Sequence, residues 1–203
     1  FITSADGSAY RLYKNNSDGT FEEDKASSGG FEALKSIKGH DALFLDFDND
    51  GHLDILVVGG PLITGAKGIM LYHNDGWGNF SETNRLLPQE IAGGTNVNAS
   101  DYNEDGDLDL YLLDLQGKLH LLRNDGGNGN HHLKMKLVGL RTGSGKNNHF
   151  GIGAKVEVRA GNLYQMMVVT SPEVHFGMAN RTKADVVRIM WTNGVPQNMF
   201  FPD

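Results

Sequence analysis

Two acidic segments of this 203-residue chain hold the side chains whose types and spacing suggest chemistry. The first has aspartates at positions 1, 3, 5 and 9 of a loop and a glycine at position 6: Asp46, Asp48, Asp50, Asp54 and Gly51. Alternate residues of a tight loop point their side chains inward, and a hard cation such as Ca²⁺ takes about six to eight oxygen ligands. The glycine allows the chain to bend sharply. This pattern predicts a calcium-binding loop.

The second segment repeats the first, because Asp101 stands 55 residues after Asp46. It has oxygen-bearing side chains at the same four positions and a glycine at the sixth: Asp101, Asn103, Asp105, Asp109 and Gly106. In each loop the main-chain carbonyl of position 7, which belongs to His52 or Asp107, is expected to turn toward the ion. We therefore expect two calcium sites, one in each loop.

An EF-hand is the main competing interpretation of these loops. It needs a bidentate glutamate at position 12 and flanking helices. Position 12 is Val57 in the first loop and Leu112 in the second, and both lie in β-type runs. Magnesium fits less well, because it usually keeps several waters and takes few protein ligands. Solvated turns without an ion are the remaining alternative, but two copies with matched ligands, glycines and following strands argue against them.

The repeat extends beyond the acidic loops. Segments with a common pattern of apolar residues followed by an Asn/Asp/Gly turn occur at 9–21, 68–80 and 117–129. Short runs rich in Leu, Ile, Val, Phe and Tyr, bounded by turn-forming residues, occur at 43–46, 53–58 and 69–73. The Asn-Asp-Gly turns at 74–76 and 124–126 indicate hairpins, because these residues tolerate positive φ. Only 31–37 has a helical pattern.

Three or four short strands in each repeat of about 55 residues match the spacing of a β-propeller blade. A backward step of one repeat places an earlier acidic loop before residue 1. We therefore expect that the chain begins inside a repeat, and that residues 1–130 form about two and a half blades of an incomplete propeller.

The residues of the acidic loops resemble a known family. DFDNDGHLDILVVGGP at 46–61 is similar to the FG-GAP/VCBS repeat of integrin α-chain propellers and of many bacterial secreted proteins. DYNEDGDLDLYLL at 101–113 matches it without the Gly-Pro ending. In that family the loop joins the first two strands of a blade and holds one Ca²⁺, so the resemblance implies the same for both loops here.

The pattern changes after about residue 130. Runs at 132–140, 153–160 and 186–191 alternate apolar with polar or basic residues, which predicts half-buried strands of an antiparallel sheet. Residues 131–203 resemble the ASPIC/UnbV domain, which often follows such repeats in secreted proteins. The matching residues are Asn148, Gly151 to Ala154, His175 to Gly177, Trp191 and Gly194. The resemblance implies a small β module and a secreted habitat, without catalytic residues.

Composition excludes several classes of function. Lys and Arg number 18 and Asp and Glu number 25, so the net charge is −7 and nucleic-acid binding through a basic face is not expected. The seven side-chain carboxylates proposed as ligands equal this net charge in number. No cysteine is present, which excludes disulfides, thiolate zinc sites and a cysteine nucleophile. No apolar run reaches the length of a membrane span, and no HExxH or GxSxG motif occurs.

These observations together predict an all-β protein, a partial β-propeller of FG-GAP/VCBS blades followed by a small antiparallel β module. We expect a non-catalytic calcium-binding protein that acts outside the cytoplasm, in the extracellular space, in the periplasm or on the cell surface. Its expected partner is a protein or a glycan, and open blade edges favour a homo-oligomer. The alternative is a polysaccharide-active or carbohydrate-binding propeller that uses Ca²⁺.

Overall fold

The computed structural model describes residues 1–126, 129–140, 142 and 147–201. This part of the chain is nearly all β and its sheets are antiparallel, in agreement with the predicted fold class. The chain divides into two compact units. The first comprises Phe1–Phe47 and His52–Asp125, and the second comprises Gly126–Asp203 together with the four residues Asp48–Gly51.

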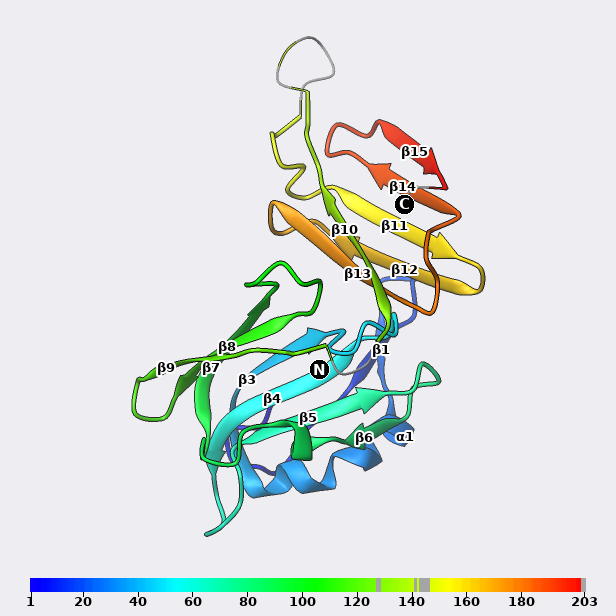
Figure 1. Ribbon diagram of the computed structural model, residues 1–203. Helices are drawn as coiled ribbons and strands as arrows, with labels where there is room; N and C mark the ends of the chain where they lie inside the picture. The colour runs from blue at the N-terminus through cyan, green and yellow to red at the C-terminus, as the bar shows by residue number, and fades with distance from the viewer. Residues whose placement is uncertain (127–128, 141, 143–146, 202–203) are drawn as a thin grey trace. The chain divides into compact units, whose positions relative to one another are not determined.

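The central sheet of the first unit has four strands in sequence order. They are β3 (Ile37–Leu45), β4 (Asp54–Pro61), β5 (Ile69–Asn74) and β6 (Phe80–Glu82) (Figure 1). The first acidic loop connects β3 to β4, and the ladder between these strands runs from the pair Leu45–Asp54 to the pair Ile37–Pro61. The loop therefore joins the first two strands of a blade-like sheet, as the family resemblance implies.

Both faces of this central sheet are covered, which explains the unbroken apolar run of β4. Ile55 and Val57 belong to one buried cluster together with Phe31 of the neighbouring helix. The residues between and after them, Leu56 and Val58, belong to a second cluster that also contains Val97 and Leu112 from the sheet of the second acidic loop. A strand that is buried on both faces needs apolar residues at every position rather than an alternation.

The remaining strands of the first unit form two smaller sheets. A three-stranded sheet contains β7 (Gly94–Ser100), β8 (Asp109–Asp114) and β9 (Leu119–Leu122), and the second acidic loop connects β7 to β8. A hairpin is formed by β1 (Tyr13–Asn15) and β2 (Phe21–Glu23). The helical segments are α1 (Lys25–Ser28), η1 (Gly29–Ser36) and η2 (Asn84–Leu86), and η1 contains most of the stretch predicted as helical.

Side chains and backbone connect the two loop-bearing sheets. The Asp41 carboxylate accepts hydrogen bonds from the Val97 amide at 3.0 Å and from the Asn96 side chain at 2.9 Å. Gly59, Gly68 and Gly93 meet where β4 ends and β5 and β7 begin, and a Cβ atom on either Gly68 or Gly93 would overlap the Gly59 carbonyl oxygen. Only glycine allows the backbone to approach so closely.

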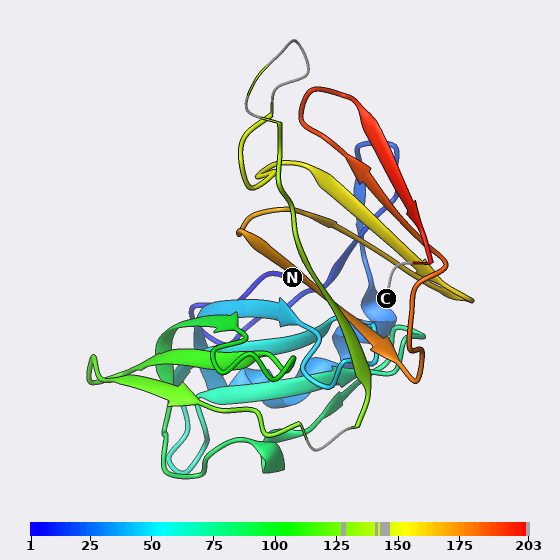
Figure 2. The same ribbon diagram turned by 45° about the horizontal axis from the view of Figure 1, so that its top comes forward.

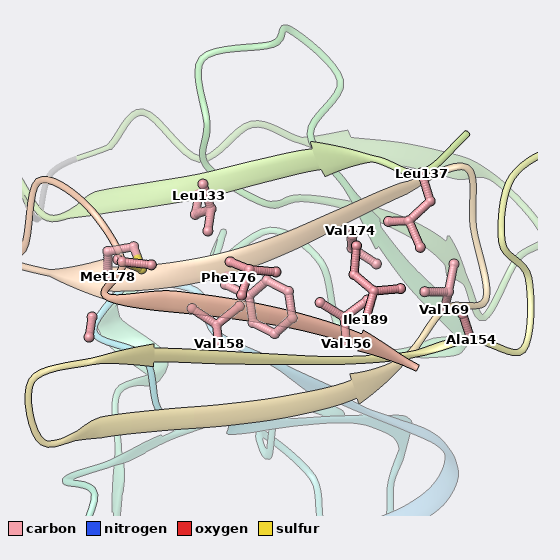
Figure 3. Close-up of a cluster of buried hydrophobic side chains, with 13 residues drawn as sticks. Leu133, Leu137, Ala154, Val156, Val158, Val169, Val174, Phe176, Met178 and Ile189 are labelled. Atoms are coloured by element: carbon pink, nitrogen blue, oxygen red, sulfur yellow. The ribbon is translucent and has the colours of Figure 1, made fainter. Parts of the chain in front are cut away.

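The second unit is a small sandwich. One layer pairs β10 (His131–Lys136) with β13 (Glu173–Ala179), and the other has the order β12 (Leu163–Val168), β11 (Lys155–Ala160), β14 (Val186–Met190) and β15 (Pro196–Phe200). Figure 2 shows β10 and β13 side by side against the four-stranded sheet. Side chains from both layers, including Phe176 and Val158, fill the space between them (Figure 3). The alternating runs predicted as half-buried strands are confirmed.

One predicted hairpin is wrong. The turn at 74–76 connects β5 to β6, as expected. The corresponding turn at 124–126 follows β9, but the next described strand, β10, pairs with β13 and not with β9. The local turn signal is the same in both places, and the strand that follows decides whether a hairpin forms.

Candidate metal centre

The two acidic loops have the same backbone conformation. Gly51 and Gly106 at position 6 have φ values of 91° and 92°, in the region that glycine adopts without strain. Position 4 is also left-handed in both loops, with φ of 58° at Asn49 and 61° at Glu104. The sequence pattern predicted the bend at the glycine but not the second left-handed residue. Asparagine tolerates this conformation, whereas for glutamate it is unfavourable.

In the first loop the carboxylates come together. One ligand atom from each of Asp46, Asp48 and Asp54 lies within 4.8 Å of the other two. Asp46 is 5% exposed and Asp54 is fully buried. Three carboxylates held this close repel one another in a medium of low dielectric, and a divalent cation would relieve that repulsion. The donor set consists of hard oxygen atoms and therefore fits Ca²⁺.

A second group of ligand atoms adds a histidine that the sequence pattern missed. Asp48, Asp50 and His73 also place one ligand atom each within 4.8 Å of one another. His73 lies on β5, and its ring meets that of Phe47 edge to face at 5.9 Å. The pairing of β5 with β4 brings His73 close to the first acidic loop. The spacing of residues along the chain therefore could not predict this histidine as a ligand.

Position 9 has a structural role in both repeats. The carboxylate of Asp54 accepts the backbone N–H groups of Phe47 at 3.1 Å and of Asn74 at 2.8 Å. Asp109 accepts the corresponding N–H groups of Tyr102 at 2.9 Å and Asn124 at 2.8 Å. Each fully buried aspartate thus fastens the start of its acidic loop to the end of the third strand of the same sheet or to the residues just after it. The spacing predicted these two residues as metal ligands, and the structure shows that they also anchor the backbone.

The second loop is arranged differently from the first. Its Asp101 accepts the Gly106 amide at 3.2 Å, and Asp105 accepts the Asp107 amide at 3.0 Å and the side-chain amide of Asn103. Asn103, Glu104 and Asp105 are exposed. Among the described residues, no three acidic or histidine side chains of this loop place ligand atoms within 4.8 Å of one another. The first loop therefore has a carboxylate cluster that could hold a metal ion, and calcium binding by either loop stays a prediction.

Hydrogen bonds within the second unit hold the loop tip, which we define as Asp48–Gly51. The Asn49 carbonyl accepts the Ala179 amide at 2.8 Å, and the Asn49 side chain bonds to His175 Nε2 at 2.7 Å. The Asp48 carbonyl accepts the Asn130 side-chain amide at 2.9 Å. Asn49 is 1% exposed, so the tip is a fixed structure and not a solvated turn.

The carbonyl ligands predicted at position 7 directly follow the two glycines. Asp107 is buried, with 9% of its surface exposed, and His52 is half-buried with its ring against Gly76. Both residues are placed after the left-handed glycine, as the sequence pattern requires. Whether their carbonyls bind an ion stays a prediction.

Outside the loops, one shallow pocket of about 270 Å³ lies in the first unit. It is lined by Tyr10 and Phe31 and by both acidic and basic side chains. Burial raises the pKa of Tyr10 to about 12, and its hydroxyl donates to the Ile37 carbonyl at 2.8 Å. This tyrosine is therefore held in a structural hydrogen bond.

Comparison with known families agrees with this architecture. The model of the FG-GAP-like repeat matches residues 1–57 and 46–112, and the two matches overlap on the first acidic loop. The chain belongs to the FG-GAP-like repeat family. The ASPIC and UnbV model matches residues 143–200 in the second unit. No curated protein matches the chain.

The repeat architecture explains why the two acidic loops occupy equivalent places. In this FG-GAP-like chain each loop connects the first two strands of a sheet, and each sheet is part of a partial propeller. Within the described residues, no helix has the length and apolar character needed to cross a membrane.

Proposed function

We propose that this chain is a non-catalytic repeat protein in which Ca²⁺ stabilises the acidic loops, so that its blades present a fixed surface to a protein or glycan partner. The observation that carries the proposal is the cluster of Asp46, Asp48 and Asp54, whose ligand atoms lie within 4.8 Å of one another. The matched left-handed positions of the two loops support a similar role for the second loop.

The expected contribution of the ion to stability follows from binding linkage. With about 1 mM free Ca²⁺ and a dissociation constant of about 0.1 mM, one site stabilises the folded state by about 1.4 kcal/mol. Domains are stable by only about 5–15 kcal/mol, so this is a substantial share. Dissociation constants in this range suit extracellular calcium rather than cytosolic calcium. We propose that the protein acts outside the cytoplasm, where free Ca²⁺ reaches this range.

Thermal unfolding with and without calcium tests the proposal. The wild-type chain should melt about 3–6 °C higher per occupied site in 1 mM CaCl₂ than in EDTA. Asp50→Ala should remove the part of this rise that depends on the first loop, and Asp105→Ala the part that depends on the second. Glu90→Ala, which removes an exposed carboxylate outside both loops, is the matched control and should keep the full rise.

Each loop is judged separately in this experiment. If Asp50→Ala keeps the full calcium-dependent rise, the first loop is not a calcium site, and the same holds for Asp105→Ala and the second loop. If the wild-type melting temperature does not respond to calcium at all, the proposal fails as a whole.

The proposal includes no reaction. An enzyme that acts on polysaccharides would need an acid and a base positioned in a cleft. The lining of the pocket in the first unit contains Glu23 and Glu32, but each of these lies beside a basic residue. Glu23 lies 3.7 Å from Arg11, and Glu32 is paired with Lys35 at 2.6 Å. This arrangement favours a binding role over catalysis.

A further inference from the structure

The four-stranded sheet of the second unit has one buried face and one exposed face. Val156, Val158, Val187 and Ile189 point into the core. The residues between them on β11 and β14, and their register partners on β12 and β15, form the opposite side, which we call the outer face. The outer face lies in one unit and contains none of the residues of the acidic loops.

Two aromatic side chains lie at opposite ends of one row on the outer face. The strand register connects Tyr164 to Arg159, Arg159 to Val186, and Val186 to Phe200. Tyr164 is 61% exposed and Phe200 is 70% exposed. Three strand spacings separate the two aromatic residues, which is about 14 Å. Exposed aromatic rings on a flat sheet are platforms on which the C–H faces of sugar rings can stack.

The charged side chains of the outer face are mostly basic. Lys155, Arg159 and Arg188 are exposed there, and Glu157 is the only acidic residue among them in the described strands. The face thus has a net charge of +2 in a chain with a net charge of −7. Residues 126–203 contain nine basic and four acidic residues, so this part of the sequence has a charge of 9 − 4 = +5. The complementary ligand is an anion.

A second copy of the chain is a poor occupant of the outer face. Two copies packed face to face would bring their positive charges together. An extended chain laid across the strands suits a flat strip of this kind.

We propose that the outer face binds an acidic polysaccharide, with sugar rings stacked on Tyr164 and Phe200 and carboxylate or sulfate groups paired with Arg159, Arg188 and Lys155. This site is independent of the calcium proposal, because it involves different residues and is measured by binding and not by melting.

Titration calorimetry with three polysaccharides tests the site. Alginate oligosaccharides present carboxylates, chondroitin sulfate adds sulfates, and dextran is the neutral control. The titrations are done in EDTA, so that calcium cannot bridge the sugar to the acidic loops. At least one of the two acidic polysaccharides should bind, and dextran should not. The difference in affinity between alginate and chondroitin sulfate identifies the preferred anion.

Variants of the outer face locate the site. Tyr164→Ala with Phe200→Ala should weaken binding at least about tenfold, because each removes a stacking platform of roughly 1 kcal/mol or more. Trp77→Ala is the matched control, since Trp77 is 89% exposed on a hairpin turn of the first unit, and it should bind as the wild type does. Arg159→Gln with Arg188→Gln should weaken binding by a similar factor and reduce its dependence on salt. Lys14→Gln, on the exposed side of β1, is the control for charge.

The proposal is overturned if neither acidic polysaccharide binds, or if dextran binds equally well. It is also overturned if Trp77→Ala weakens binding as much as the paired aromatic variant, or if single-stranded DNA competes as effectively as the sugars, because binding would then rest on charge alone. Sedimentation of the free protein is the last check. A dimer that the outer-face variants dissociate would assign this face to a second copy. Circular dichroism checks that each variant is folded. If the paired aromatic variant is unfolded, the binding of the paired arginine variant tests the proposal.

Discussion

Asp54 and Asp50 belong to the same loop but have different tasks. Asp54 is fully buried and accepts two backbone N–H groups, whereas Asp50 is partly exposed. Removal of the Asp54 carboxylate leaves two part-buried backbone donors without this acceptor, at a cost of about 1–3 kcal/mol each. Asp54→Ala should therefore destabilise the protein by about 2–5 kcal/mol in EDTA as well as in calcium.

Urea unfolding in EDTA checks this difference between the two aspartates. Asp50→Ala should change the free energy of unfolding little in EDTA. It should lower this free energy relative to the wild type mainly when calcium is present. If both variants lose the same free energy of unfolding in EDTA, Asp54 anchors the backbone no more than Asp50 does.

Asp114, the last residue of β8, is a further aspartate whose carboxylate accepts backbone amides. The hydrogen bond from the His120 ring, with those from the Lys118 and Gln116 amides, lowers the pKa of the Asp114 carboxyl below its ordinary value. A lowered folded-state pKa contributes stability above the ordinary carboxyl pKa, and this contribution is lost as the pH falls through the lowered value.

Removal of the histidine should reverse part of this effect. His120→Ala should raise the pKa of Asp114 toward its ordinary value, as measured by an NMR titration of the side-chain carboxyl carbon. An unchanged titration curve would show that the backbone amides alone account for the low pKa.

At the scale of elements, close contact between backbones determines how the blades join. A Cβ on Gly68 would overlap the carbonyl oxygen of Gly59, whereas a Cβ on Gly60 would have its nearest neighbours at 3.9 Å. Gly68→Ala should therefore lower the free energy of unfolding by about 2–3 kcal/mol, and Gly60→Ala should change it by less than about 1 kcal/mol. Denaturant midpoints of the two variants measure the contrast, and similar midpoints would mean that the junction is not tightly packed.

At the scale of the whole molecule, the side-chain carboxylates proposed as ligands equal the net negative charge in number. They number seven in a chain with a net charge of −7. Without calcium these charges repel one another, and added salt screens that repulsion within a Debye length of about 10 Å at 0.1 M. NaCl at about 0.3 M should therefore raise the melting temperature more in EDTA than in calcium. Choline chloride at the same ionic strength is the control for specific ion binding, and an equal salt effect in both buffers would contradict this expectation.

The repeat, the fold class, the loop positions and the glycine bends can all be predicted from the sequence. These features depend on local spacing, namely alternate oxygen ligands, a glycine that permits positive φ, and short apolar runs between turns. The fold is needed to see that β4 is buried on both faces, that Asp54 and Asp109 anchor backbone amides, and that His73 approaches the first loop. The alignment of Tyr164 and Phe200 in one row of the outer face also follows from strand pairing. Each of these contacts joins segments through strand pairing and sheet packing, and a pattern read along the chain has no access to such long-range register.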